Sequence, residues 1–189
     1  MQARKLFEDF SFFLGNDVLF FPSKEIMLYD VEAKSYDTVY QRIRVLDRIL
    51  RGDYSIIVTS AEAVSHKLVS PEIFRNCLLE INMNSRLDLS QLARSLVMMA
   101  YEKTEIVEKA GQFAIRGGII DIFSIESEYA VRIELFDDEV DSIRQFDINT
   151  QRSVDRMDKA RITPAREVIY ESSRMQAIIQ EIRSDLSRH

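Results

Sequence analysis

Residues 129–146 read YAVRIELFDDEVDSIRQF, and this stretch decides the fold class of the surrounding chain. Two runs rich in Ile, Val and Phe flank the polar pair Asp137-Asp138, a composition typical of two strands joined by a hairpin turn. Alternate side chains of a strand point to opposite faces of the sheet. We therefore predict an antiparallel hairpin of 129–136 with 139–146, with one buried face and one polar face.

The parity of the first strand sorts its side chains into two sets. Val131, Ile133 and Leu135 share one face and must point to the core. Arg132 and Phe136 fall on the other face, and aromatic and arginine side chains are the residues that dominate binding faces. The alternative is that Phe136 packs under a neighbouring helix or loop, and single exposed apolar residues are common as well. The pattern alone leaves these interpretations open.

The segment before the hairpin shows the same alternation. Phe113 and Ile115 share the inward parity, so Arg116 falls on the opposite face, directly before Gly117-Gly118. Adjacent glycines in a strand region indicate a bulge or the close approach of another backbone. A plain structural bend is the other interpretation.

The hairpin belongs to a longer region of short apolar runs separated by Gly, Asp and Asn. We interpret it as a mostly antiparallel sheet, preceded by a strand at 77–83 and by a helix that Asp88 caps and that runs to about Ala100. Residues 76–164 therefore form an α+β domain. The runs lie at 105–108, 112–116, 118–123, 129–136, 139–146 and 151–162.

The flanking residues 1–75 and 165–189 predict a second unit, a partial parallel α/β lobe into which the α+β domain is inserted. Strands at 18–21 and 56–58 alternate with helices, which favours a parallel sheet covered by helices. The expected helices are 2–14, a long helix with Val39, Ile43, Leu46 and Leu50 on one face, a short helix from Thr59 or Ser60 through Val69, and 172–186.

The composition indicates a globular protein whose partner is another protein. The chain has 189 residues and a formal net charge of −6, which argues against nucleic acid as its main ligand, because phosphate binding depends on clustered Lys and Arg. Cys77 is the single cysteine, and His66 and His189 give no zinc spacing. We expect a cytoplasmic protein without metal, cofactor, signal peptide or membrane span.

Catalytic patterns are weak, and we predict that the chain is not an enzyme. No G-x-x-x-x-G-K-[ST] phosphate loop occurs, and the chain has five glycines in all. The acidic residues at 137–141 lack the spacing of a calcium loop, so a solvated turn is the better interpretation. Tyr, Ser and His are present without a pattern of nucleophile and base.

A family resemblance adds to this interpretation. Residues 111–123 (GQFAIRGGIIDIF), together with 129–136 and 138–144, resemble the signature shared by the transcription-repair coupling factors (Mfd) and UvrB. Residues 146–153 (FDINTQRS) look like Mfd and depart from UvrB, and Phe20-Phe21-Pro22 and Leu28-Tyr29-Asp30 also resemble the Mfd pattern.

The resemblance implies a non-catalytic adaptor that recruits the nucleotide-excision-repair protein UvrA to stalled transcription. It implies that the α+β domain binds UvrA through Arg116, Arg132 and Phe136, and that the flanking lobe is a degenerate helicase-like domain cut at its N-terminus. Lys103 stands where UvrB has an arginine and is carried as a further contact, although lysine lacks the planar fork of arginine. The parent would be an ATP-dependent DNA translocase that meets RNA polymerase and DNA through its other parts.

Two other functions remain open at this point. One is a DNA-binding or helicase fragment that needs a missing N-terminal segment, and the other is a structural scaffold for the rest of the parent. For the adaptor function we expect that truncation of Arg132 or Phe136 to Ala weakens UvrA binding and leaves the fold intact, because both side chains lie off the core face.

Overall fold

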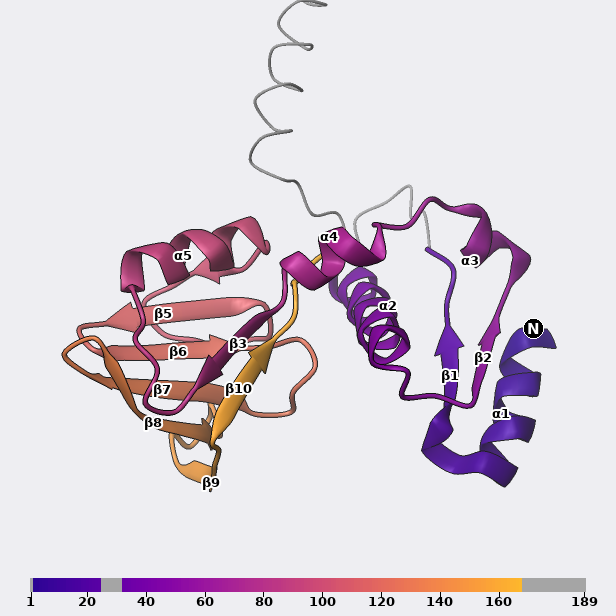
Figure 1. Cartoon of the computed structure of the whole chain (residues 1–189). Helices are drawn as coiled ribbons and strands as arrows, with labels where there is room; N and C mark the ends of the chain where they lie inside the picture. The colour runs from indigo at the N-terminus through magenta and orange to yellow at the C-terminus, as the bar shows by residue number, and fades with distance from the viewer. Residues whose placement is uncertain (1, 25–31, 168–189) are drawn as a thin grey trace, which may run out of the picture.

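A computed structural model describes residues 2–24 and 32–167 of the chain. The predicted helix at 172–186 and the motif Leu28-Tyr29-Asp30 lie outside these residues. The described part is a mixed α/β structure with one parallel strand pair and a larger, mostly antiparallel sheet (Figure 1).

The first part of the chain builds the parallel pair. β1 (Val18–Phe21) and β2 (Ile56–Thr59) lie in parallel, with Val18 opposite Ile56. Parallel neighbours need a crossover connection, and α2 (Glu32–Arg51) lies in the segment that joins them. The other elements of this part are α1 (Gln2–Leu14), the 3-10 turn η1 (Gly15–Asp17), α3 (Ala61–Ser65) and α4 (Pro71–Asn76).

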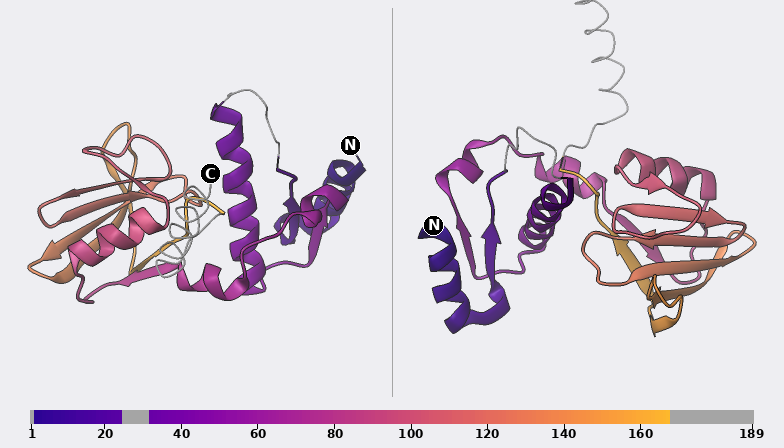
Figure 2. Two further views of the ribbon diagram at one scale, coloured as in Figure 1. Left: turned by 90° about the horizontal axis from the view of Figure 1, so that it is seen from above. Right: turned by 180° about the vertical axis from the view of Figure 1, so that it is seen from behind.

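The helix α2 lies between the strand pair and the larger sheet in both sets of views (Figures 1 and 2). The predicted apolar face is confirmed: Ile43 is fully buried, and Val39, Leu46 and Leu50 pack against the same core. Val45 points to the other side, into a smaller cluster with β1. The helix therefore shares apolar contacts with the sheets on both of its sides.

The larger sheet has six strands in the order β4-β5-β6-β7-β8-β9. Each neighbouring pair is antiparallel except β4 with β5. A separate antiparallel pair joins β3 (Leu79–Asn82) to β10 (Lys159–Ile162). The six strands are β4 (Glu102–Lys103), β5 (Gln112–Arg116), β6 (Ile119–Phe123), β7 (Ala130–Phe136), β8 (Glu139–Phe146) and β9 (Ser153–Arg156).

The core lies on one face of this sheet, under α5 (Leu89–Met98) and against the pair β3 and β10. Leu92 and Leu96 of α5 meet Phe113, Ile133 and other apolar side chains of the strands in one cluster. The predicted cap is confirmed, because Asp88 accepts hydrogen bonds from the backbone amides of Ser90 and Gln91 at 2.7 and 2.9 Å.

Three predicted elements are corrected. Residues 105–108 are not a strand, and the edge strand lies earlier, at β4. The run 151–162 is two strands in different sheets, because the chain leaves β9 and crosses to β3. The short helix ends at Ser65 instead of Val69, and a separate helix, α4, follows with Ser70 as its cap and Pro71 at its start.

Candidate partner-binding face

Strand register brings Arg116 and Arg132 to the same face of the six-stranded sheet. Asp121 of β6 pairs with Ala114 of β5 on one side and with Arg132 of β7 on the other. Arg116 is two residues from Ala114, so its side chain points to the face that Asp121 and Arg132 share. These two arginines reach a common carboxylate from both neighbouring strands.

The carboxylate of Asp121 is buried, with 2% of its side chain exposed. Its Oδ1 accepts a hydrogen bond from Arg132 Nε at 2.6 Å, and its Oδ2 accepts from Arg132 Nη2 at 2.9 Å. Arg116 Nη2 donates to the same Oδ2 at 2.6 Å, and its Nη1 donates to the carbonyl of Glu105 at 2.8 Å. One buried negative charge therefore orders two guanidinium groups, and the cluster keeps a net positive charge.

Arg132 also contacts Phe146 and Gln151. Its guanidinium carbon lies 4.3 Å from the ring centroid of Phe146, within the range of a cation–π contact. Its Nη2 also donates to Gln151 Oε1 at 3.0 Å. The hydrogen bond with Asp121 raises the pKa of Arg132 above its ordinary value, so the group remains charged. Only 15% of the side chain is exposed, against 43% for Arg116.

Phe136 stands at the end of β7, opposite Glu139, on the polar face. Its side chain is 79% exposed, so it does not pack under a helix or loop. Val131 and Ile133 are buried on the opposite face, as parity predicts, whereas Leu135 is half-buried and packs at the margin of the core. A register shift between Glu134 and Leu135 leaves this alternation intact, because the extra residue lies in β8.

Gly117 and Gly118 directly follow Arg116 and have two structural roles. Gly117 has a φ of +59°, and the two glycines form the turn between β5 and β6. A Cβ on Gly118 would lie 3.1 Å from the backbone oxygen of Leu135. The pair is thus a hairpin turn and also the place where the backbone of β7 approaches closely.

The charged face continues from Arg132 toward the hairpin of β7 and β8. Glu134 forms an ion pair with Arg144 on the neighbouring strand and accepts a hydrogen bond from Ser142 at 2.8 Å. Both Glu134 and Arg144 are about one-third exposed. This pair separates Arg132 from the exposed ring of Phe136.

The structure does not bring Lys103 to this face. Lys103 pairs with Phe113 at the sheet edge, and Phe113 belongs to the core face. Its neighbour Glu102 takes the polar side, where its Oε2 accepts a hydrogen bond from Gln112 at 3.1 Å. Lys103 is exposed, and its role as a partner contact stays a prediction.

Sequence reasoning missed the two residues whose side chains accept hydrogen bonds from Arg132. A signal for Asp121 was present, since it is the one charged residue in the apolar run 119–123 and lies on the strand between those of Arg116 and Arg132. Gln151 gave no such signal, because its contact depends on a loop in which Asp147 accepts hydrogen bonds from the backbone amides of Asn149 and Thr150.

The expectation that truncation of Arg132 leaves the fold intact stays untested, but the contacts of Arg132 predict a loss of stability. Its side chain lies off the core, but it neutralises the buried carboxylate of Asp121 and covers the ring of Phe146. A buried charge that loses its partner is strongly destabilising. Phe136 has no such structural role, so it is the cleaner probe of binding.

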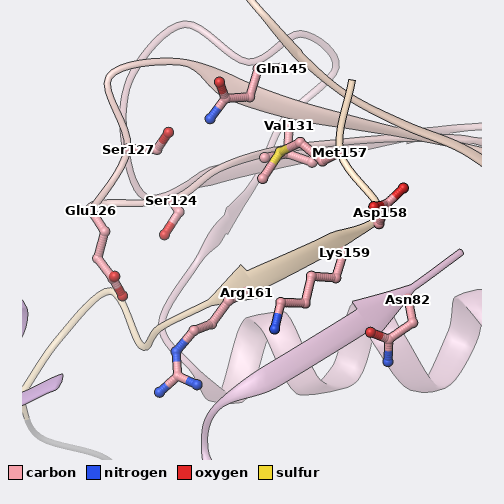
Figure 3. A pocket seen from close by; sticks show the side chains of 10 residues that line it. All are labelled: Asn82, Ser124, Glu126, Ser127, Val131, Gln145, Met157, Asp158, Lys159 and Arg161. Atoms are coloured by element: carbon pink, nitrogen blue, oxygen red, sulfur yellow. The ribbon is translucent and has the colours of Figure 1, made fainter. Parts of the chain in front are cut away.

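A second polar region lies on the other side of the sheet. A pocket of about 630 Å³ is lined by ten residues, among them Ser124 and Glu126 from the loop after β6 and Lys159 and Arg161 from β10 (Figure 3). Burial, and then the nearby charge of Asp47, raise the pKa of Glu126 to about 7.

Within residues 2–24 and 32–167, no group of three metal-binding side chains occurs, and no helix has the length and apolar character to cross a membrane.

Comparison with known proteins relates the part of the chain that contains the six-stranded sheet to a known domain. Residues 79–168 match the family model of the UvrB interaction domain. The chain is 35% identical over 187 residues to the transcription-repair-coupling factor of Bacillus subtilis (strain 168), and 33% identical over 184 residues to that of Staphylococcus aureus (strain USA300). These matches cover 98% and 97% of the chain but 16% of each relative. Residues 79–168 are therefore similar to the UvrB interaction domain, and the chain is similar over nearly its whole length to one segment of the transcription-repair-coupling factors.

Proposed function

We propose that the chain is a non-catalytic adaptor region that binds UvrA through the face formed by Arg116, Arg132 and Phe136. Its role would be to bring UvrA to stalled transcription for nucleotide excision repair. The observation that carries the proposal is Phe136, a large aromatic ring 79% exposed on the same sheet face as two ordered arginines. Exposed aromatic and arginine side chains are the usual anchors of protein interfaces.

The geometry also suggests what the partner offers. Phe136 needs an apolar pocket, because burial of an exposed aromatic ring supplies most of its binding energy. Arg116 is 43% exposed, and the cluster of two guanidinium groups and one carboxylate is positive. A partner surface with an apolar pocket and a nearby carboxylate would complement this face.

The proposal extends to the organisation of the chain. We place the interaction domain at 76–164 and a degenerate helicase-like lobe at 1–75 and 165–189. The pairing of β3 with β10 supports the domain, since it brings the two ends of the segment 79–162 together. Ile43 of α2 and Ala165 share the core of this domain, so the lobe also braces it.

The test is a calorimetric titration of UvrA with the wild-type chain and with two matched variants. Phe136→Ala should weaken binding by about 2 kcal/mol or more, the usual threshold for an interface anchor. Phe13→Ala is the control, because Phe13 is also 79% exposed and lies on α1, away from the proposed face. The proposed face is contradicted if both variants lose the same affinity for UvrA. It is also contradicted if neither variant loses affinity.

A DNA-binding role predicts different results. Binding of a DNA duplex that weakens steeply with salt, together with no binding of UvrA, would favour it. For the adaptor, we expect UvrA binding and no DNA shift at physiological salt. The structural-scaffold alternative predicts binding of neither.

A further inference from the structure

We infer that Asp121 is the positioning residue of the partner-binding face, which acts by fixing the guanidinium groups of Arg116 and Arg132 before the partner arrives. The inference rests on the proposed function for its partner, but its structural part can be tested without one. Asp121 is 2% exposed and cannot itself meet a partner. Any effect of Asp121 on binding must pass through the side chains that it holds.

The contacts of Asp121 determine which arginine donors are available to a partner. Arg132 donates to Asp121 through its Nε and Nη2, so its Nη1 group is available. Arg116 gives Nη2 to Asp121 and Nη1 to the carbonyl of Glu105, so its guanidinium plane is fixed at two points. A partner carboxylate would therefore meet donors whose directions are set in advance.

This arrangement reduces the conformational entropy that the two arginine side chains lose when the partner binds. Long arginine side chains lose rotamer freedom when they are immobilised at an interface, and that loss weakens binding. Asp121 removes this freedom in the free protein, where it lies between two strands that fix its own position. The order of the guanidinium groups is thus a property of the fold.

An opposing effect must be weighed. Removal of the carboxylate would raise the positive charge of the face, which speeds the association of an acidic partner. Orientation acts mainly on dissociation, because it concerns contacts made only in the complex. The two effects therefore separate in a kinetic measurement, and this separation distinguishes a positioning role from a simple charge effect.

The experiment uses the full chain and the variant Asp121→Asn, which keeps the shape and removes the charge. An amide can accept from one arginine but presents N–H groups to the other, so at least one guanidinium is released. The matched control is Asp155→Asn, the same change at an exposed carboxylate of β9. Both variants are first compared with the wild type by thermal unfolding and by the Nε–H signals of arginine in NMR spectra.

In the free protein, Asp121→Asn should lose the protected Nε–H signal of Arg132, and Asp155→Asn should keep it. With UvrA, Asp121→Asn should dissociate about tenfold faster, because at least one arginine side chain regains rotamer freedom, and should associate no more slowly. In an Arg116→Ala background the effect of Asp121→Asn should shrink, whereas in a Phe136→Ala background it should stay the same.

Two outcomes would overturn the inference, and a third would overturn only the proposed function. The Nε–H signal of Arg132 could survive in Asp121→Asn, which would show that other contacts order the group. The dissociation rate could remain that of the wild type while only the fraction of binding-competent protein falls, which would show a purely structural role. If wild type does not bind UvrA, the proposed function fails, and the NMR comparison alone decides whether Asp121 orders the arginines.

Discussion

At the scale of single residues, the site depends on buried charges that a strand pattern does not reveal. Asp121 is a buried carboxylate with two arginine partners. Arg132 lies on the polar face of its strand, but it also neutralises this buried charge. Asp47 of α2 is the counterpart on the other side of the molecule, with no exposed side-chain surface and ion pairs to Arg51 and Arg161.

Arg132→Ala should lower the free energy of unfolding. Asp121 would keep Arg116 alone as its partner, so we expect a loss of about 2–3 kcal/mol, somewhat below that of a buried charge left without any partner. Urea unfolding measures this loss. Arg156→Ala is the control, because Arg156 is exposed on β9 and its change should stay within about 0.5 kcal/mol. Equal stability of the two variants would show that Arg132 is not part of the fold.

Glu126→Gln should stabilise the protein at pH 8 and have little effect at pH 5. Burial, and then the negative charge of Asp47, raise the pKa of Glu126 to about 7, although Arg51, Arg161 and Arg44 oppose the shift. A carboxyl group whose pKa is raised by folding stabilises the fold fully below its ordinary pKa, and this contribution is lost as pH rises through the folded value.

The midpoint of thermal unfolding at the two pH values tests this prediction. At pH 8 we expect the unfolding midpoint of the variant to rise by about 2 °C. A stabilisation of about 1 kcal/mol raises the midpoint by about 2–4 °C in a chain of this size. The lower value is expected because Glu126 is only partly buried. Glu128→Gln, in the same loop, is the matched control. A rise at pH 5 as large as that at pH 8 would contradict the assignment of Glu126.

At the scale of elements, alternation of side chains predicted most of the sheet and the common face on which Arg116, Arg132 and Phe136 lie. Strands 112–116 and 139–146 have the predicted bounds, and the outward parity of Arg116, Arg132 and Phe136 is confirmed by the register. The run 151–162 could not be divided from the sequence, because its two strands differ in their partners and not in their composition. The single charge of Asp121 in an apolar run was visible in the sequence, but its hydrogen bonds with Arg132, like that of Gln151, join distant side chains and leave no periodic signal.

Gly118→Ala should distort the turn between β5 and β6. The added Cβ would lie 3.1 Å from the backbone oxygen of Leu135, which is fixed in β7 and must move by a few tenths of an ångström. We expect a loss of about 1–2 kcal/mol in chemical unfolding, as for overpacking elsewhere.

Gly117→Asn is the comparison for that variant. Gly117 has a φ of +59° and open space around its Cβ position, and asparagine tolerates this conformation. Its loss of stability should therefore be the smaller of the two. The reverse order would show that the approach of β7 does not require glycine at 118.

At the scale of the whole molecule, α2 is tied to β10 and to the loop after β6 by polar contacts as well as by its apolar face. Arg161 of β10 bridges Asp47 of α2 at 2.6 Å and Glu80 of β3 at 3.0 Å. Arg44 of α2 donates to the carbonyl of Ile125 at 2.9 and 2.6 Å. The sequence predicted the apolar face of this helix but not its buried charges, because a charged residue on a helix usually indicates a solvated face.

Arg161→Ala should loosen the contact between α2 and β10. Asp47 would keep Arg51 as a partner, so we expect a loss of about 2 kcal/mol, less than for a buried carboxylate with no partner. Hydrogen exchange should increase at the amides of α2 and β10, while those of β6 and β7 stay protected. Faster exchange throughout the six-stranded sheet would show that the bridge supports the whole fold and not this contact alone.

The measurement that tests the central claim most directly is photo-crosslinking to UvrA from a benzophenone analogue of phenylalanine. The analogue is placed at position 136 in one sample and at position 13 in another, two sites of equal exposure. The account predicts a strong crosslink to UvrA from position 136, which excess unlabelled chain abolishes, and none from position 13. A crosslink from position 13 alone, or from neither position while the complex forms, would contradict the claim that the Phe136 face binds the partner.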